Sequence, residues 1–249
     1  MKVLALNSSP RTGTVSKTEI MLDCLVDGMR EKGADVEVVN LRKKRIDYCV
    51  ACFTCWTKTP GKCALKDDMA TDLLPKYLEC DLCVLATPLY HYTVNAQMKA
   101  FIERTLPIIE PFFVLKDGVT SHPTRQPIPS TVFLSGAAFP EPSVFDLLRP
   151  YVRFLFGESL VAEIYRPAAE MLTTSGSNEV VADVLAALTQ GGRELADNRQ
   201  ISPDTLQKIE QPITDFDGMA RVANIAWQAC IDRGITPAEL RKKRVRPRP

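Results

Sequence analysis

The feature that most constrains the fold is the order of elements in the first 41 residues of the chain. Residues 2–6 are a short apolar run typical of a buried strand, and residues 7–16 are a polar loop. Residues 17–32 carry apolar side chains at helical spacing, and Gly33 is placed to end that helix. Residues 35–41 then alternate between polar and apolar side chains, as a second strand does. This strand–loop–helix–strand order predicts a parallel α/β fold.

The remainder of the chain continues the alternation of strands and helices. Apolar runs predict three more strands, over residues 81–87, 131–135 and 160–165. Helices are expected over residues 68–78, 96–106, 143–156, 179–188 and 213–233. The proline-rich stretch 107–129 is expected to be mostly loop. Together these elements predict a doubly wound five-stranded parallel sheet followed by a helical C-terminal extension.

Length and charge restrict the class of protein. The chain has 249 residues and a net charge of +1, which fits one α/β domain with an extension and gives no field that recruits nucleic acid. No apolar run approaches the roughly 18–20 residues that a membrane span needs, and the N-terminal run is too short for a signal peptide. We therefore expect a cytoplasmic protein with no nucleic-acid or membrane partner. The basic tail, residues 241–249, is expected to be a solvated end.

The loop after the first strand has the composition of a phosphate site. In an open parallel sheet, ligands bind beyond the carboxyl ends of the strands. Hydroxyl groups of Ser9, Thr14 and Ser16, the guanidinium of Arg11 and the N–H groups at the start of the next helix all suit a phosphate. No G-x-G-x-x-G pattern follows the strand, which disfavours dinucleotide binding of the Rossmann type. A helix-capping loop without a ligand is the alternative that these residues leave open.

Four of the eight cysteines lie within fifteen residues. Cys49, Cys52 and Cys55 are spaced by three, and Cys63 follows after seven intervening residues. In a reducing compartment such a group does not indicate a disulfide framework. Consecutive spacings of three favour an iron–sulfur cluster over structural zinc, which usually uses two separated C-x2-C pairs. Free or redox-active thiols remain open, and buried structural roles are expected for the other cysteines, Cys24, Cys80, Cys83 and Cys230.

Three short motifs resemble one known family. The stretch Ser-Pro-Arg-Thr-Gly at 9–13 resembles the S-P-R-x-G phosphate loop of the flavodoxin-like NAD(P)H-dependent FMN reductases. Residues 86–104 are similar to the family's T-P-x-Y and K-x-F-x-D/E-R stretch, whose loop wraps the edge of the isoalloxazine ring. The turn at 135–139 falls where the family has a third flavin loop, and the cysteine spacing resembles that of the iron–sulfur flavoproteins. The resemblance covers about residues 1–165.

The resemblance implies a domain organisation and a set of ligands. It implies an FMN-binding domain over residues 1–165 with a cysteine insertion at 42–67, and a helical extension over residues 166–249. The implied FMN contacts are Ser9, Arg11, Thr14, Val15, Ser16, Pro88, Leu89, Tyr90, His91, Tyr92, Val94, Ser135, Gly136 and Ala137. The implied ligands of a 4Fe–4S cluster are Cys49, Cys52, Cys55 and Cys63.

The function expected from this resemblance is FMN-dependent electron transfer. The flavin would exchange electrons with the cluster, and the donor would be NAD(P)H or a protein electron donor such as ferredoxin. The resemblance also implies a homodimer or homotetramer. No catalytic acid–base residue is expected, and no hydrolase motif is present. Two alternatives stay open: a cluster-free NAD(P)H-dependent FMN or quinone reductase, and a non-catalytic binding module that kept the fold.

Several single residues carry their own expectations. His91 is expected to shape the backbone of its loop rather than to act as an acid or base, and His122 is expected to be solvated. Trp56 is expected to shield the neighbouring cysteines from water. Asp67 and Asp68 are expected to cap the helix that follows them.

Overall fold

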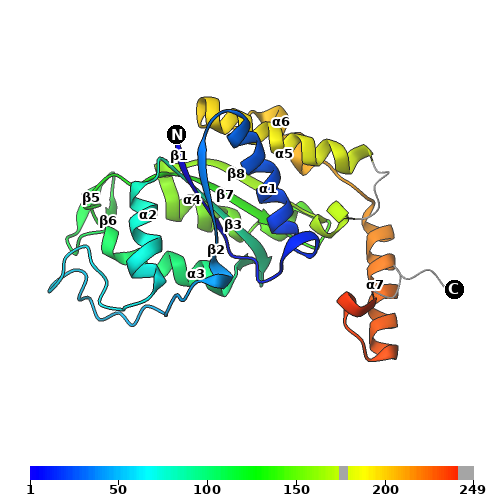
Figure 1. Cartoon of the computed structure of the whole chain (residues 1–249), viewed down its shortest axis with the longest axis horizontal. Coiled ribbons are helices and arrows are strands. Elements are labelled where there is room, and N and C mark those ends of the chain that lie inside the picture. Colours follow the sequence, from blue (N-terminus) through cyan, green and yellow to red (C-terminus); the bar gives the residue numbers. More distant parts are fainter. Residues whose placement is uncertain (174–178, 241–249) are drawn as a thin grey trace. The chain divides into compact units, whose positions relative to one another are not determined.

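A computed structural model describes residues 1–173 and 179–240 of the chain (Figure 1). The chain divides into two compact units, Met1–Gln211 and Pro212–Pro249. The boundary expected at residue 165 marks where the family resemblance ends, and it stays a prediction. The basic tail 241–249 lies outside the described residues.

The first unit is built on one parallel sheet, and all five predicted strands are present. They are β1 (Lys2–Asn7), β2 (Asp35–Asn40), β3 (Leu82–Tyr90), β7 (Ser130–Gly136) and β8 (Leu160–Arg166). The strands lie in the order β2-β1-β3-β7-β8, which confirms the doubly wound sheet and is the flavodoxin-like order. The order reverses between β1 and β3, so the loops that follow these two strands diverge and leave a crevice at the carboxyl edge.

The helices confirm the predicted elements with differences at their ends. They are α1 (Lys17–Glu31), α2 (Leu74–Glu79), α3 (Ala96–Glu103), α4 (Leu148–Phe156), α5 (Glu179–Asn198), α6 (Pro203–Glu210) and, in the second unit, α7 (Phe216–Arg233). The predicted helix 143–156 is divided, because Pro142–Phe145 forms a 3₁₀ turn ahead of α4. The predicted helix 68–78 starts as one π-helical turn, Met69–Leu73, ahead of α2. Other 3₁₀ turns are Gly13–Val15, Leu41–Lys43, Leu106–Ile108, Gly157–Ser159 and Ala169–Thr173.

Helix α5 is ten residues longer than predicted, and α6 was not predicted. The sequence prediction ended α5 before the glycine pair Gly191–Gly192. In the structure these glycines continue the helix because α5 packs directly on α1, as Figure 1 shows. A Cβ on Gly28 of α1 would overlap the carbonyl oxygen of Thr189, and one on Gly192 would overlap that of Leu25. The two helices therefore meet backbone to backbone at these glycines.

One short hairpin extends the parallel sheet, and a second one forms a separate two-stranded sheet. The end of β3 pairs with β4 (Thr93–Val94), and the predicted loop 107–129 contains the antiparallel pair β5 (Val114–Lys116) and β6 (Val119–Ser121). Strand β3 is buried on both faces over its first six residues, as its continuous apolar sequence indicated. No helix within residues 1–173 and 179–240 is long and apolar enough to cross a membrane.

Candidate functional site

The carboxyl edge of the sheet carries a pocket of about 500 Å³, which we call the edge pocket. Its walls come from the loops after β1, β3 and β7 and from the turn after β8. Its lining residues are Ser9, Arg11, Ser16, Lys17, Thr18, Pro88, Leu89, Tyr90, Gly136, Ala137, Ala138, Ala169 and Glu170. This is the place in an open α/β sheet where ligands bind.

One end of the edge pocket is polar and lies at the start of α1. The Ser16 hydroxyl accepts a hydrogen bond from the Glu19 N–H at 3.2 Å, which makes Ser16 the N-cap, and it donates to Ser9 Oγ at 2.8 Å. The side chain of Lys17 is only 7% exposed, and its ammonium group donates to the Thr14 carbonyl oxygen at 2.9 Å. A helix N-terminus with two hydroxyls and a buried lysine suits an anionic group.

A carboxylate of the chain itself lies at this polar end. Glu170 forms an ion pair with Arg11 at 2.9 Å and approaches the Lys17 ammonium at 3.7 Å. Glu170 comes from the turn after β8, which is distant in sequence from the first loop. The two cations are therefore paired with a carboxylate of the chain itself, and cations of this kind can also hold a phosphate.

The other end of the edge pocket is apolar and carries a strained turn. Pro88, Leu89 and Tyr90 close the pocket, and the chain then reverses at His91 and Tyr92 into β4. Both turn residues have positive φ angles, 46° and 64°, which favour glycine or asparagine. Strain of this kind collects at ligand sites and switch regions. The expectation that His91 shapes the backbone of its loop agrees with this geometry.

The structure brings part of the predicted FMN set together in one pocket. Eight predicted residues line it: Ser9, Arg11, Ser16, Pro88, Leu89, Tyr90, Gly136 and Ala137. Six predicted residues do not line it: Thr14, Val15, His91, Tyr92, Val94 and Ser135. Thr14 and Val15 are exposed in the turn before α1, whereas Val94 and Ser135 are buried in strands β4 and β7. The buried Ser135 hydroxyl has no hydrogen-bond partner among the described residues.

Sequence reasoning missed four lining residues, namely Lys17, Thr18, Ala169 and Glu170, whereas Ala138 lies within the turn 135–139 that the resemblance indicated. Lys17 and Thr18 follow the loop directly, so their place in the first turn of the helix was a usable signal. Ala169 and Glu170 lie beyond the stretch covered by the family resemblance. Nothing local in the sequence indicates that their turn reaches back to Arg11.

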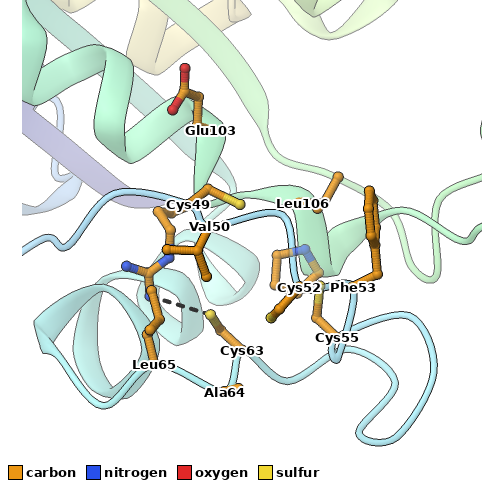
Figure 2. A pocket seen from close by; sticks show the side chains of 12 residues that line it. Cys49, Val50, Cys52, Phe53, Cys55, Cys63, Ala64, Leu65, Glu103 and Leu106 are labelled. Atoms are coloured by element: carbon orange, nitrogen blue, oxygen red, sulfur yellow. Dashed lines mark hydrogen bonds between the residues drawn. The ribbon is translucent and has the colours of Figure 1, made fainter.

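A second, small cavity is lined by all four clustered cysteines, and we call it the cysteine cavity (Figure 2). Residues 47–67, here the cysteine loop, supply most of its wall, and the end of α3 supplies another part. Its lining residues are Cys49, Val50, Cys52, Phe53, Cys55, Cys63, Ala64, Leu65, Glu103, Arg104, Leu106 and Pro107. The four predicted ligands are thus neighbours in space as well as in sequence.

The cysteine loop is irregular but closed at its base. The backbone N–H of Asp68 donates to the Arg45 carbonyl oxygen at 3.1 Å, and the Arg45 N–H donates to Asp68 Oδ2 at 2.7 Å. One step further in, the Asp47 N–H donates to Asp67 Oδ2 at 2.8 Å. Inside the loop, Ala51 has a positive φ angle of 50°, a further strained position at a candidate site.

Arg104, the C-cap of α3, occupies the base of this loop. Its guanidinium makes two hydrogen bonds to the Asp67 carboxylate, at 2.6 and 2.9 Å, and one to the Asp47 carbonyl oxygen at 2.5 Å. A fourth hydrogen bond, at 3.4 Å, reaches the sulfur of Cys63 and is the dashed line in Figure 2. The side chains of Arg104 and Asp67 are 1% and 0% exposed, so this is a buried ion pair.

The aspartates of the base differ from the sequence prediction. Burial raises the pKa of Asp67, but hydrogen bonds from Arg104 and from the N–H groups of Asp47 and Ala70 outweigh burial and lower that pKa. The bond from Ala70 agrees with the expected capping role of Asp67. Asp68 does not cap the helix with its side chain, because its carboxylate accepts from Arg45 instead. The ion pair with Arg104 was not predicted.

The four cysteines are free thiols that influence one another. Burial raises the pKa of Cys55, and the nearby Cys63, Cys52 and Cys49 raise it further, whereas hydrogen bonds involving Thr54 lower the pKa of the exposed Cys52. Within the described residues, no three His, Cys, Asp or Glu side chains are grouped so that they could hold one metal ion. The donor chemistry suits an iron–sulfur cluster, since four thiols and a buried cation share a cavity. Binding requires the thiols to converge further.

Two aromatic residues near the cavity differ from expectation. Trp56 does not line the cavity. Its indole N–H donates to the Leu106 carbonyl oxygen at 3.2 Å, and this bond ties the loop to the segment after α3. His122 is half-buried rather than solvated, because the β5–β6 hairpin brings its ring within 5.1 Å of the Trp56 ring and 4.9 Å of the Phe113 ring.

The other four cysteines lie away from the cavity. Cys80, Cys83 and Cys230 are buried, as expected. Cys24 is only half-buried, on α1. Burial and the neighbouring carboxylates Asp27 and Asp23 raise its pKa, so it stays a thiol at neutral pH.

Comparison with known proteins finds sequence similarity in the N-terminal part of the chain. Residues 1–113 match the family model described as NADPH-dependent FMN reductase. An iron–sulfur flavoprotein of Archaeoglobus fulgidus is 42% identical over 109 residues, which are 43% of this chain and 46% of that protein. An iron–sulfur flavoprotein of Methanocaldococcus jannaschii is 32% identical over 108 residues, which are 43% of this chain and 53% of that protein. The chain thus spans about half the length of the curated relatives that it matches.

Solved structures extend the likeness of fold beyond that half. An NAD(P)H:quinone oxidoreductase from Methanothermobacter marburgensis superposes with a TM-score of 0.59 at 18% identity. The superposition covers 78% of this chain and 96% of that one. At this identity the likeness supports the flavodoxin-like fold alone.

Proposed function

We propose that the chain is an FMN-dependent oxidoreductase that transfers electrons, because residues 1–113 match the model of the NADPH-dependent FMN reductases and resemble iron–sulfur flavoproteins. The observation that carries the proposal is the edge pocket. Three loops far apart in sequence meet there at the carboxyl edge of the sheet, with hydroxyls and cations at one end and apolar side chains at the other. This division of polarity matches a ligand with a phosphate and a flat ring.

The phosphate of FMN would lie at the start of α1. Ser9 and Ser16 would donate hydrogen bonds to it, and Arg11 and Lys17 would neutralise its charge after releasing Glu170. The ring would lie against Pro88, Leu89 and Tyr90 on one side and Gly136 and Ala137 on the other.

The cysteine cavity would hold a 4Fe–4S cluster through Cys49, Cys52, Cys55 and Cys63. When bound, FMN supplies one- and two-electron chemistry and the cluster supplies single-electron transfer. The chain would supply four thiol ligands, the buried guanidinium of Arg104 and the cavity that these residues line. The proposed donor is NAD(P)H, or a protein electron donor such as ferredoxin, and the proposed assembly is a homodimer or homotetramer.

The test is anaerobic purification of the full chain, followed by an absorption spectrum, iron and sulfide analysis and titration with FMN. The proposal expects quenching of flavin fluorescence with one FMN per chain, a broad cluster shoulder beside the flavin bands, and oxidation of NADH or NADPH with an added acceptor. A chain that stays colourless after FMN titration, with no quenching, would contradict the proposal. It would favour the non-catalytic binding module instead.

A cluster-free NAD(P)H-dependent FMN or quinone reductase is the second candidate. The observation that favours it is the spread of the cysteines, which form no compact ion-binding group among the described residues. Iron and sulfide near zero in protein never exposed to oxygen, together with bound FMN and NAD(P)H oxidation, would decide for this second function.

A further inference from the structure

We infer that Arg104 is a positioning residue that closes the base of the cysteine loop and holds Cys63 at the cavity, so that its charge acts on the anionic group bound there. The inference rests on the proposed function for the nature of that group. It concerns a residue outside the four thiols.

The contacts of Arg104 span the whole loop. Its guanidinium binds Asp47, two residues before Cys49, and Asp67, four residues after Cys63. Asp67 in turn accepts the Asp47 N–H, so the two ends of the loop and the end of α3 are joined at one point. A single buried side chain therefore fixes where an otherwise irregular segment of 21 residues begins and ends.

The charge of Arg104 also faces the cavity. Its guanidinium donates to the sulfur of Cys63, and Arg104 is one of the residues that line the cavity. Its Nε atom is buried and has no hydrogen-bond partner among the described residues. A buried N–H without an acceptor is costly, and an anionic group in the cavity can supply the acceptor.

A fixed cation beside a thiolate-bound cluster has a defined effect. Net charge and hydrogen bonds to the sulfurs set the reduction potential of a cluster. Because the reduced cluster carries one more negative charge, the guanidinium stabilises the reduced form and raises the potential. Lysine keeps the charge but cannot bind a carboxylate bidentately and also reach a sulfur and a carbonyl oxygen in the same fixed geometry.

The test compares three variants of the full chain with the wild type after anaerobic reconstitution with iron and sulfide. The double variant Asp67→Asn with Arg104→Met removes both charges, so that neither is left buried alone. Arg104→Lys keeps the charge. Lys58→Gln removes an exposed cation from the same loop and serves as the matched control. The readouts are iron per chain, the cluster potential by redox titration, FMN affinity and the rate of protease cleavage within residues 47–67.

The double variant is expected to bind the cluster about tenfold or more weakly, in line with other residues that support metal ligands. The cluster that it retains is expected to have a more negative potential, because the lost guanidinium lines the cavity and contacts Cys63 whereas the lost Asp67 carboxylate does not line the cavity. Arg104→Lys is expected to restore the potential in part, Lys58→Gln is expected to match the wild type, and FMN affinity is expected to stay constant in all. Equal iron content and equal potential in the double variant and the wild type would overturn the inference while leaving the proposed function intact.

Failure of the proposed function gives a different pattern. A wild-type chain that takes up no iron would overturn the cluster assignment. Protease cleavage of the metal-free protein would then test whether Arg104 closes the loop. Faster cleavage of the double variant within residues 47–67 would support that role, and equal cleavage would overturn it.

Discussion

The edge pocket and the cysteine cavity differ in what holds their walls. The edge pocket is bounded by the ends of β1, β3 and β7, which are hydrogen-bonded neighbours or near neighbours in one sheet, and by the first turn of α1. The cysteine cavity is bounded by an irregular loop whose position depends on a few side chains, above all Arg104 and Asp67. Regular backbone pairing sets the first site, and a buried ion pair sets the second.

This difference predicts how each site fails. Many backbone hydrogen bonds between strands hold the walls of the edge pocket in place. A single side-chain substitution there is therefore expected to change ligand affinity more than the free energy of unfolding. The position of the cysteine loop depends on one buried ion pair. A single substitution in that pair is therefore expected to change both the free energy of unfolding and the shape of the cysteine cavity. Four substitutions test this contrast, from the largest expected effect to the smallest.

Asp67→Ala is expected to have the largest effect, because it leaves the buried guanidinium of Arg104 without its carboxylate. The free energy of unfolding should fall by about 3–5 kcal/mol in urea denaturation. The double variant Asp67→Asn with Arg104→Met should lose less than this single variant, since no charge stays unpaired. A loss of well under 1 kcal/mol for Asp67→Ala would show that the ion pair does not hold the loop.

Gly192→Ala is expected to come next, because its Cβ would overlap the Leu25 carbonyl oxygen on α1. Forcing α1 and α5 apart should lower the free energy of unfolding by about 2–3 kcal/mol. It should also weaken FMN binding, since α1 carries Ser16 and Lys17. Gly191→Ala is the matched control, as its Cβ meets the Ile201 side chain at an ordinary 3.4 Å. Equal free energies of unfolding and equal FMN affinities for Gly192→Ala and Gly191→Ala would show that the close approach of the two helices at Gly192 is not important.

Lys17→Met should act on the edge pocket alone. Loss of a buried charged donor is expected to weaken FMN binding by about tenfold or more, followed by quenching of flavin fluorescence. Riboflavin, which lacks the phosphate, should bind both proteins equally. Lys32→Met, at the other end of α1 and paired with Asp197, is the control. A similar loss for riboflavin would place the effect of Lys17 on the ring or the fold rather than on the phosphate.

Asp72→Asn should have the smallest effect. Hydrogen bonds from Lys44 and Lys76 lower the pKa of Asp72 below its ordinary value of 3.8, but the side chain is 26% exposed. The wild type should exceed the variant by less than about 1 kcal/mol at neutral pH. Because the folded pKa is the lower one, this advantage is present above pH 3.8 and is lost as the pH falls through the folded pKa. Urea denaturation across the acid range measures it, and an advantage that grows on acidification would contradict the sign.

The parts of the fold that follow from local periodicity could be predicted from the sequence. All five strands of the sheet were predicted, because short continuous apolar runs such as 82–87 are typical of strands that are buried on both faces. The end of α5 was not predicted, because Gly191 and Gly192 normally weaken a helix. Only the close approach of α1 explains why glycine is needed there.

The candidate sites show the same division. Motifs in consecutive residues, such as Ser9 with Arg11 and the four cysteines, pointed to residues that line the edge pocket and the cysteine cavity. Contacts between distant residues left no local signal, so Glu170 at the polar end of the edge pocket and Arg104 beside Cys63 were not predicted. His122 was misjudged for the same reason, since its partner Trp56 is 66 residues away in the chain.

The glycine contact between α1 and α5 limits how far the protein can be truncated from its C-terminal end. Helix α5 lies wholly outside the segment that resembles the family, yet it covers one side of the helix that begins at Ser16. A shortened version ending at residue 165 would keep every recognisable motif and uncover the backbone of α1 at Leu25 and Met29, which Gly192 of α5 approaches in the intact chain. Such a fragment would be prone to aggregate, so a shortened version of the first unit should include residues up to the end of α5.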